Sequence, residues 1–245
     1  MTVEFRPRVA LASLSGRSDA EWARGAVPFA GAAFLGGIAI DEATREAARE
    51  MVDRDRDEFL PEDPVVCRDH DAILEINAHC RQAEVCAAGA GETLLRDPER
   101  LCEQVRAASG TEATISVKVR TEVEGVNLPA LAREVTDAGA AFVHVDAMDS
   151  EAVVGEVVEA SDASVIANNG VRGRESVHEY LSYGADAVSV GRPSDDPTVL
   201  ARVRDATAAW FEERGSGVGR GYGAGEGRAG STGGPPSEPQ GGGPR

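Results

Sequence analysis

The sequence predicts a (β/α) TIM barrel that lacks one βα unit, on the basis of three observations. Short runs rich in β-branched residues alternate with longer segments of helical periodicity, which implies a parallel sheet built from βαβ units. These runs are almost continuously apolar, as expected of strands that are buried on both faces of a sheet. Seven such runs are present, whereas a complete barrel of this class has eight strands.

The seven predicted strands lie within a 245-residue chain, a length suited to one large domain. They are RVALASL (8–14), AAFLGGI (32–38), AILEIN (72–77), TISVKV (114–119), AFVHVD (141–146), SVIANN (164–169) and AVSVG (187–191). The second and third runs start 40 residues apart, with one evident helix between them at about residues 41–59. Either the barrel closes with seven strands, or a βα unit has been lost there, as the third of the barrel.

The C-terminal segment 215–245 is predicted to be a disordered tail. Of its 31 residues, 13 are glycine and four are proline. Such a segment cannot bury enough apolar surface to offset the entropy lost on ordering. The barrel domain is therefore assigned to residues 1–214.

Composition limits the environment and the classes of function. No segment approaches the roughly 20 apolar residues that span a bilayer, and the N-terminus MTVEFRPRVAL lacks the apolar core of a signal peptide, so we expect a cytoplasmic protein. The net charge of −17 argues against simple electrostatic attraction to nucleic acid, and with a single lysine it indicates a halophilic source. Four cysteines without a CxxC pair predict neither a disulfide framework nor a metal site.

Polar residues follow the predicted strands where a barrel carries its active site, at the carboxyl ends. They include Ser13, Asn77, His79, Cys80, Lys118, Arg120, His144, Asp146, Asn168, Asn169 and Arg192. Lys118 is the only lysine among 25 basic residues. Its compact ammonium has a chemistry that the planar fork of arginine cannot imitate.

Two late motifs predict a phosphate site. ANNGVRG (167–173) and GADAVSVGR (184–192) each place a glycine where a strand ends. Backbone N–H groups at such glycines, together with a helix N-terminus, bind a phosphate after the last strands of a barrel. The pair of motifs favours a cofactor that carries a phosphate group.

The ordered motifs also carry a family resemblance. EINAHC (75–80), GAGETLLRDPERL (89–101), VKVR (117–120), VHVD (143–146), IANNGV (166–171) and GADAVSVGR together resemble the FMN-dependent tRNA-dihydrouridine synthases. The similarity is greatest to an archaeal branch of related barrel proteins, and it covers about residues 8–205.

The resemblance implies FMN as cofactor, NADPH or NADH as electron donor, and reduction of the C5–C6 bond of a uracil ring in tRNA. It implies that Cys80 is the general acid, a role for which an ordinary thiol, with a pKa of about 8.5, carries the proton at neutral pH. It implies Asn77 as a substrate-binding residue, and its neighbours His79 and Arg81 are assigned to the same role by position. The cofactor-binding positions it implies are Ser13, Lys118, Arg120, His144, Gly170, Gly191 and Arg192, and the strand-end residues Asn168 and Asn169 are assigned with them.

The chain also departs from the family pattern. His79 and Arg81 stand where the family has glycine and proline around the cysteine. The glutamine of the third strand has no counterpart, and the glycine-rich tail is not expected to be the helical domain that binds tRNA. Three hypotheses follow: a reductase of uracil in tRNA, a flavin oxidoreductase of a small pyrimidine-like molecule, and a catalytically silent phosphate-binding scaffold.

Overall fold

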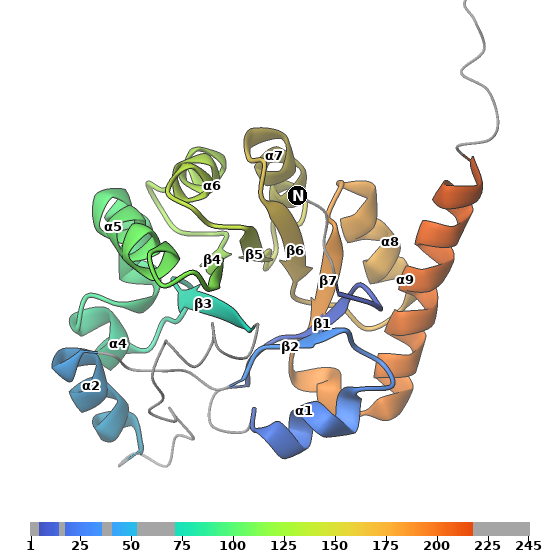
Figure 1. The fold of residues 1–245 in the computed structure, drawn as a ribbon, viewed down its shortest axis with the longest axis horizontal. Helices are drawn as coiled ribbons and strands as arrows, with labels where there is room; N and C mark the ends of the chain where they lie inside the picture. Colours follow the sequence, from blue (N-terminus) through green and yellow to red (C-terminus); the bar gives the residue numbers. More distant parts are fainter. Residues whose placement is uncertain (1–4, 15–17, 36–40, 53–71, 218–245) are drawn as a thin grey trace, which may run out of the picture.

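The computed structural model describes residues 5–14, 18–35, 41–52 and 72–217. Within these residues, seven parallel strands curve around a central axis and helices surround them on the outside (Figure 1). The strands are β1 (Val9–Leu11), β2 (Ala32–Ala33), β3 (Ile73–Asn77), β4 (Thr114–Arg120), β5 (Phe142–Asp146), β6 (Ser164–Asn168) and β7 (Ala187–Val190). This arrangement confirms the predicted α/β barrel architecture.

The sheet runs in the order β2-β1-β7-β6-β5-β4-β3. Its two ends, β2 and β3, flank the stretch of sequence in which no further strand is predicted. In the described part of the chain these two strands do not pair, and the intervening residues 36–40 and 53–71 lie outside the description. Strand β1 is shorter than the predicted run 8–14 because its paired residues cover only Val9–Leu11, and β2 ends at Ala33; residues 36–38 of the second predicted run lie outside the described residues.

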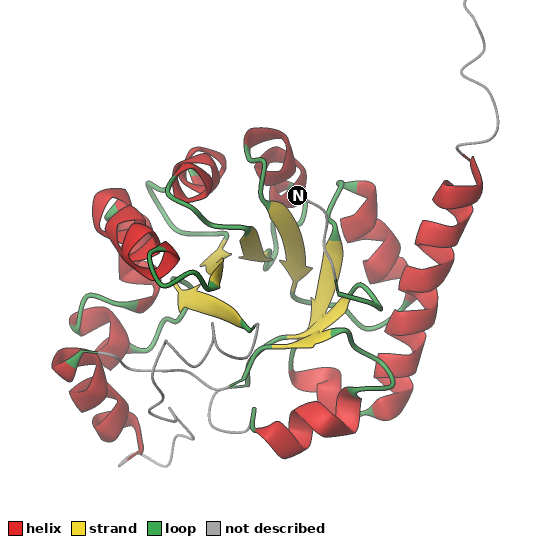
Figure 2. Cartoon of the chain, in the orientation of Figure 1, coloured by secondary structure: helices red, strands yellow, loops and turns green. Residues whose placement is uncertain are grey.

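The helices lie between consecutive strands and outside them (Figure 2). Asp97 and Asn127 each accept a hydrogen bond at a helix N-terminus, from Arg100 N at 3.2 Å and Ala130 N at 3.1 Å. The α-helices are α1 (Ala20–Ala26), α2 (Glu42–Val52), α4 (Ala83–Ala87), α5 (Pro98–Ser109), α6 (Leu128–Asp137), α7 (Val153–Ala160), α8 (Arg174–Ser182) and α9 (Pro197–Gly217), with 3-10 turns η2 (Gly91–Arg96) and η3 (Arg192–Asp195).

Helix α9 continues to Gly217, three residues past residue 214, where the predicted barrel domain ends. The rest of the predicted tail, residues 218–245, lies outside the described residues. None of the helices in the described chain is both long and apolar enough to cross a membrane.

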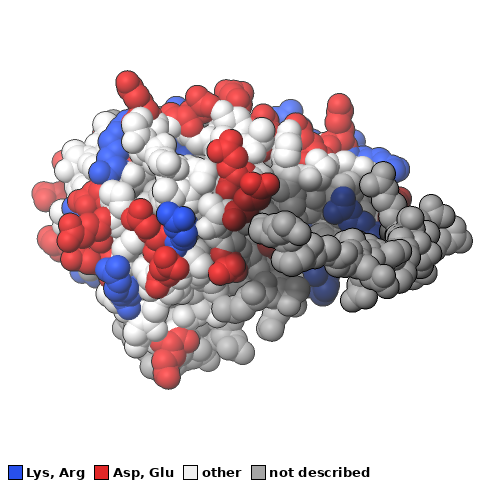
Figure 3. Space-filling model, turned by 90° about the horizontal axis from the view of Figure 1, so that it is seen from above, with Lys and Arg blue, Asp and Glu red and all other residues white. Residues whose placement is uncertain are grey.

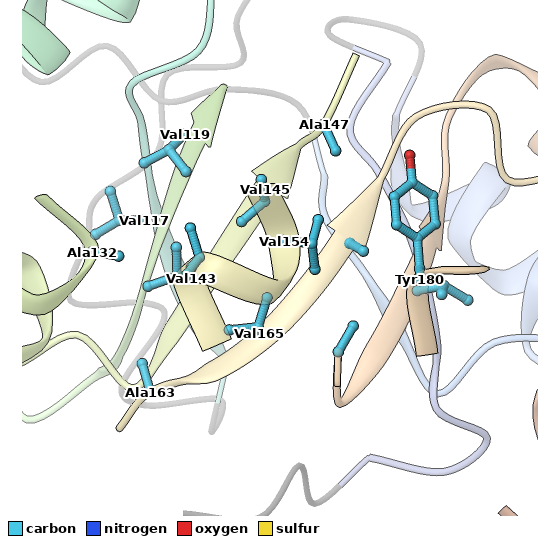
Figure 4. Packing of buried hydrophobic residues seen from close by; sticks show 14 of the residues in the cluster. Val117, Val119, Ala132, Val143, Val145, Ala147, Val154, Ala163, Val165 and Tyr180 are labelled. Atoms are coloured by element: carbon cyan, nitrogen blue, oxygen red, sulfur yellow. The ribbon is translucent and has the colours of Figure 1, made fainter. Parts of the chain in front are cut away.

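Alternation along the strands separates two apolar layers. Residues such as Val117, Val143 and Val165 pack outward against the helices, where Tyr180 of α8 is also buried (Figure 4). A smaller cluster fills the inside of the sheet, and it includes Ala10, Phe34, Ile166 and Ala187. Because side chains alternate, the strand residues between the outward valines point into the barrel.

Candidate functional site

The loop that follows β3 holds Cys80 in place through its own side chains and backbone. The Asn77 side-chain oxygen accepts hydrogen bonds from the amides of His79 and Cys80, each at 3.1 Å. The Cys80 carbonyl accepts the amide of Glu92 at 2.9 Å and the thiol of Cys86 at 3.5 Å. The predicted substrate residue Asn77 therefore shapes the loop with its oxygen and leaves its amide nitrogen for other partners.

The glycine-rich segment before η2 approaches this loop closely. Gly91 has φ +61°, and a Cβ at this position would lie 2.4 Å from the Cys80 carbonyl oxygen. Only glycine has both the conformational freedom and the absence of a side chain that this contact requires. The GAGE sequence thus fixes the position of Cys80.

A hydrogen-bonded chain crosses the inside of the barrel below this loop. Glu75 Oε2 accepts from Ser116 Oγ at 2.9 Å and lies 2.9 Å from His144 Nδ1. His144 Nε2 lies 2.7 Å from Ser189 Oγ, and the Phe34 ring packs 5.0 Å from the imidazole. His144 is fully buried, so both of its ring nitrogens have partners from the protein itself.

The protonation states of His144 and Glu75 follow from their surroundings. Burial lowers the pKa of His144 below its ordinary value, although the adjacent Glu75 carboxylate opposes the shift. Burial alone would raise the pKa of Glu75, but the hydrogen bonds from His144 and Ser116 and the charge of Lys118 hold it below its ordinary value. A neutral imidazole next to an ionised carboxylate is therefore the favoured state.

Lys118 lies next to this chain on β4, paired in register with Asn77 on one side and His144 on the other. Its side chain is only 3% exposed, and within the described chain its ammonium donates no hydrogen bond to another residue. Burial lowers the pKa of Lys118, and the negative charges of Glu75 and Asp146 oppose this effect. The buried ammonium is thus available to an acceptor that is not part of the described protein.

His79 and Asp146 lie beside one another at the carboxyl ends of the strands. His79 Nδ1 is 3.8 Å from one Asp146 oxygen, and the Asn169 side-chain amide donates to the other oxygen at 2.9 Å. Burial, followed by the nearby charges of Lys118 and His144, holds the pKa of His79 well below its ordinary value. The neutral imidazole of His79, the carboxylate of Asp146 and the side-chain amide of Asn169 therefore lie beside one another near the ammonium of Lys118.

Arg120 occupies a different position from Lys118, although both residues belong to β4. Its guanidinium Nε donates to the Thr121 carbonyl at 3.3 Å, and its Nη1 lies 3.6 Å from Glu92 Oε2. The residue lines a groove of about 750 Å³ between the loop after β4 and helix α7. Arg120 thus joins the Cys80 loop to the rim of the barrel through Glu92.

The two glycine motifs meet at the ends of the adjacent strands β6 and β7. Within the described residues, the amides of Gly170, Val171, Gly191 and Arg192 donate no hydrogen bond to the protein. A Cβ at Gly170 or Gly191 would meet no atom within 4 Å. The structure therefore leaves donors and open space together where the sequence predicts a phosphate.

The asparagines before the first glycine support this turn. Asn168 Nδ2 donates to the Ser189 carbonyl at 3.1 Å. The Tyr180 hydroxyl donates to the Asn169 carbonyl at 2.9 Å and lies 3.3 Å from that of Asn168. Asn168 therefore supports the turn from within the barrel wall, and α8 holds it from outside.

The remaining predicted site residues lie at the rim. Ser13 follows Ala12, whose amide donates to the Val190 carbonyl at 2.9 Å, so the end of β1 is adjacent to the Gly191 turn. Arg81 and Arg192 are exposed. The structure thus brings Cys80, Lys118 and the glycine turns to one end of the barrel.

Sequence reasoning missed Glu75, Ser189 and Glu92 as members of the site. A signal for Glu75 was present, since a charged residue stands between Leu74 and Ile76 in a strand expected to be buried on both faces. Ser189 similarly interrupts the apolar run AVSV. Nothing in the sequence singled out Glu92, whose role depends on its contact with Arg120 across the loop.

The fold and the site define a parallel α/β barrel with a polar, charged site at the carboxyl ends of its strands. Residues 65–216 match the family model for dihydrouridine synthase, and the chain belongs to that family.

Individual relatives agree with this assignment. An uncharacterized protein of Methanocaldococcus jannaschii is 26% identical over 237 residues, which cover 76% of this chain and 88% of that protein. The tRNA-dihydrouridine synthase B of Xanthomonas axonopodis pv. citri is 29% identical over 150 residues. That match covers 55% of this chain and 45% of the relative, so the chain spans about half the length of the synthase.

Solved structures support the fold alone. The BexX/CysO complex of Amycolatopsis orientalis matches with a TM-score of 0.51 at 18% identity, over 87% of this chain and 93% of the other. A variant of mandelate oxidase matches with a TM-score of 0.50 at 18% identity, over 82% of this chain and 74% of the other.

Proposed function

We propose that the protein is an FMN-dependent oxidoreductase that reduces the C5–C6 bond of a uracil ring, with tRNA as the substrate. The observation that carries the proposal is the buried ammonium of Lys118, which has no hydrogen-bond partner in the described protein and lies at the same end of the barrel as Cys80. An ammonium with so little exposure and no hydrogen-bond acceptor in the described protein favours a ligand that supplies one. Membership of the dihydrouridine synthase family makes a flavin the first candidate.

The residues present fit FMN at both ends of the cofactor. The amides of Gly170, Val171, Gly191 and Arg192 would hold the phosphate, since they have no acceptor among the described residues and a Cβ at Gly170 or Gly191 would meet no atom within 4 Å. Lys118 would stabilise the negative charge that develops on the reduced ring. FMN, when bound and reduced, would supply the hydride for the uracil C6.

Cys80 would donate the proton that C5 receives. Hydrogen bonds to Asn77 and from Glu92 hold the backbone amide and carbonyl of Cys80, so the position from which its thiol side chain extends is fixed. A general acid needs such placement, because proton transfer requires hydrogen-bond distance to the reacting atom. His79 and Asp146 would border the substrate on the side of the loop.

A second candidate substrate is a small pyrimidine-like molecule. The net charge of −17 favours it, and Figure 3 shows acidic side chains spread over one face of the molecule with arginines scattered between them. Such a surface gives little attraction to a polyphosphate backbone.

The test uses purified protein, Cys80→Ala, and Cys102→Ala as a matched control, because Cys102 is buried in α5 away from the site. We expect FMN in all three proteins and loss of uracil reduction in Cys80→Ala alone. Full turnover in Cys80→Ala would refute the general-acid role. Unchanged dihydrouridine in tRNA from a deletion strain would reject tRNA in favour of the small substrate.

A further inference from the structure

The buried polar chain inside the barrel has a feature that the proposed chemistry does not use. Glu75 is a carboxylate on β3 with only 12% of its side chain exposed, and it precedes the loop that carries Cys80. Its contacts are internal: Ser116 on β4 and His144 on β5, both at 2.9 Å to the same oxygen. A buried carboxylate requires compensating charge as well as hydrogen bonds.

Lys118 is the neighbouring cation. It is the register partner of His144, which Glu75 contacts directly, and it follows Ser116 by two residues on the same face of β4. The other charged or titratable groups around it are His79 after β3, Arg120 on β4, and His144 and Asp146 on β5. Two of the groups near the ammonium are carboxylates, and of the two Glu75 has the larger effect on it.

We propose that Glu75 is a positioning residue of the site: without a direct ion pair, its carboxylate supplies negative charge on the face of the sheet that carries Lys118, and it fixes His144 as the neutral tautomer with the proton on Nδ1. In this state His144 Nδ1–H donates to Glu75, and the Ser189 hydroxyl donates to Nε2 at 2.7 Å. Each donor in the hydrogen-bonded series that joins Ser116, Glu75, His144 and Ser189 then has one acceptor. The ammonium of Lys118 keeps its proton although the residue is only 3% exposed.

The consequence for function is that Lys118 keeps its positive charge although it is buried. Without Glu75 the ammonium would lose its larger negative neighbour, while its desolvation would remain. Lys118 would then release its proton at lower pH and lose its attraction for an anionic ligand edge. Only this last step rests on the proposed function, since the ionisation of Lys118 is a property of the protein alone.

The single lysine makes this ionisation directly measurable. In full-length protein labelled with ¹³C and ¹⁵N in lysine, one side-chain signal reports the titration of Lys118, without cofactor. We expect Glu75→Gln to raise the acid dissociation constant of Lys118 at least about tenfold. Asp146→Asn should raise it by less. Ser116→Ala removes a hydrogen bond to Glu75 but no charge, so it should change the constant by less than about threefold.

Two further measurements separate charge from packing. Glu75→Asp keeps the charge, so it should stay closer to the wild type than Glu75→Gln; equal shifts in the two variants would overturn the role of the Glu75 charge. In the wild-type protein, ¹⁵N histidine signals should show one buried imidazole that is protonated on Nδ1 and does not titrate between about pH 6 and 8. A protonated or Nε2–H imidazole at that site would overturn the proposal even if no variant folds.

FMN titration of the same proteins completes the design. If Lys118 holds the cofactor, the affinity of Glu75→Gln for FMN should fall with rising pH at least about tenfold more than that of the wild type. A shifted lysine titration in a protein that binds no FMN would refute the proposed function and leave the Glu75 inference standing. An unshifted lysine titration in a protein that binds FMN would refute the Glu75 inference and leave the proposed function standing.

Discussion

Replacement of Gly91 by alanine tests how the chain positions Cys80. The new Cβ would lie 2.4 Å from the Cys80 carbonyl oxygen, and Cβ contacts essentially do not occur below 3.0 Å, so the loop must move by at least about 0.6 Å. A left-handed conformation costs an L-residue about 1–2 kcal/mol, and loss of the Glu92–Cys80 hydrogen bond costs about 1 kcal/mol more. The free energy of unfolding should therefore fall by about 2–3 kcal/mol.

Gly125→Ala is the matched control. Gly125 also has a positive φ, of +79°, but a Cβ there would meet no atom within 4 Å. Both variants share the backbone penalty, and only Gly91→Ala displaces Cys80. In thermal unfolding, the Tm of Gly91→Ala should lie about 2–4 °C below that of Gly125→Ala.

Turnover separates the two variants more sharply. A misplacement of about 1 Å costs about a hundredfold in rate, so a shift of about 0.6 Å should lower uracil reduction about tenfold. Gly125→Ala should keep the wild-type rate. Equal Tm values and equal rates in the two variants would refute the view that Gly91 sets the position of Cys80.

Three other changes probe the rest of the site. Gly191→Val adds a side chain where a Cβ meets no protein atom, so the Tm and the affinity for riboflavin should not fall. The affinity for FMN should fall at least tenfold, which corresponds to about 1.4 kcal/mol of binding free energy. Parallel losses of affinity for both flavins would contradict a phosphate site. Tyr180→Phe removes the donor to the Asn168 and Asn169 carbonyls, and it should cost about 1–2 kcal/mol in urea unfolding, whereas an unchanged midpoint would mean that the turn does not depend on it. His79 and His144 have lowered pKa values in the fold, so the unfolded chain binds more protons than the folded chain below about pH 6.5. The free energy of unfolding should therefore fall by about 1 kcal/mol per histidine between pH 7.5 and 5.5. Constant stability over this range would show that the imidazoles are not held neutral.

The strands were predictable because each is a short apolar run between polar loops. TISVKV and AFVHVD lie within one residue of β4 and β5 at each end, since burial on both faces leaves a continuous signal. The N-terminal strands were less well bounded, because AAFLGGI is apolar beyond the two residues that pair with β1. Hydrophobicity predicts which segment is buried, and the pairing of neighbouring strands decides where a ladder ends.

Within the site, positions at strand ends were predictable and contacts were not. Lys118 stood out as the only lysine, but its place between Asn77 and His144 depends on strand register. His144 was expected at the cofactor, and the structure gives both of its nitrogens partners inside the barrel. The Glu75–His144 contact joins residues 69 positions apart, a pairing that no local pattern in one sequence can reveal.

The flavin content of the purified full-length protein is the most direct test of the central claim. We expect a yellow protein that retains FMN, or takes it up from solution, at about one molecule per chain, through Lys118 and the turns at Gly170 and Gly191. A colourless protein that binds no FMN when it is added in excess would contradict the proposed flavin chemistry.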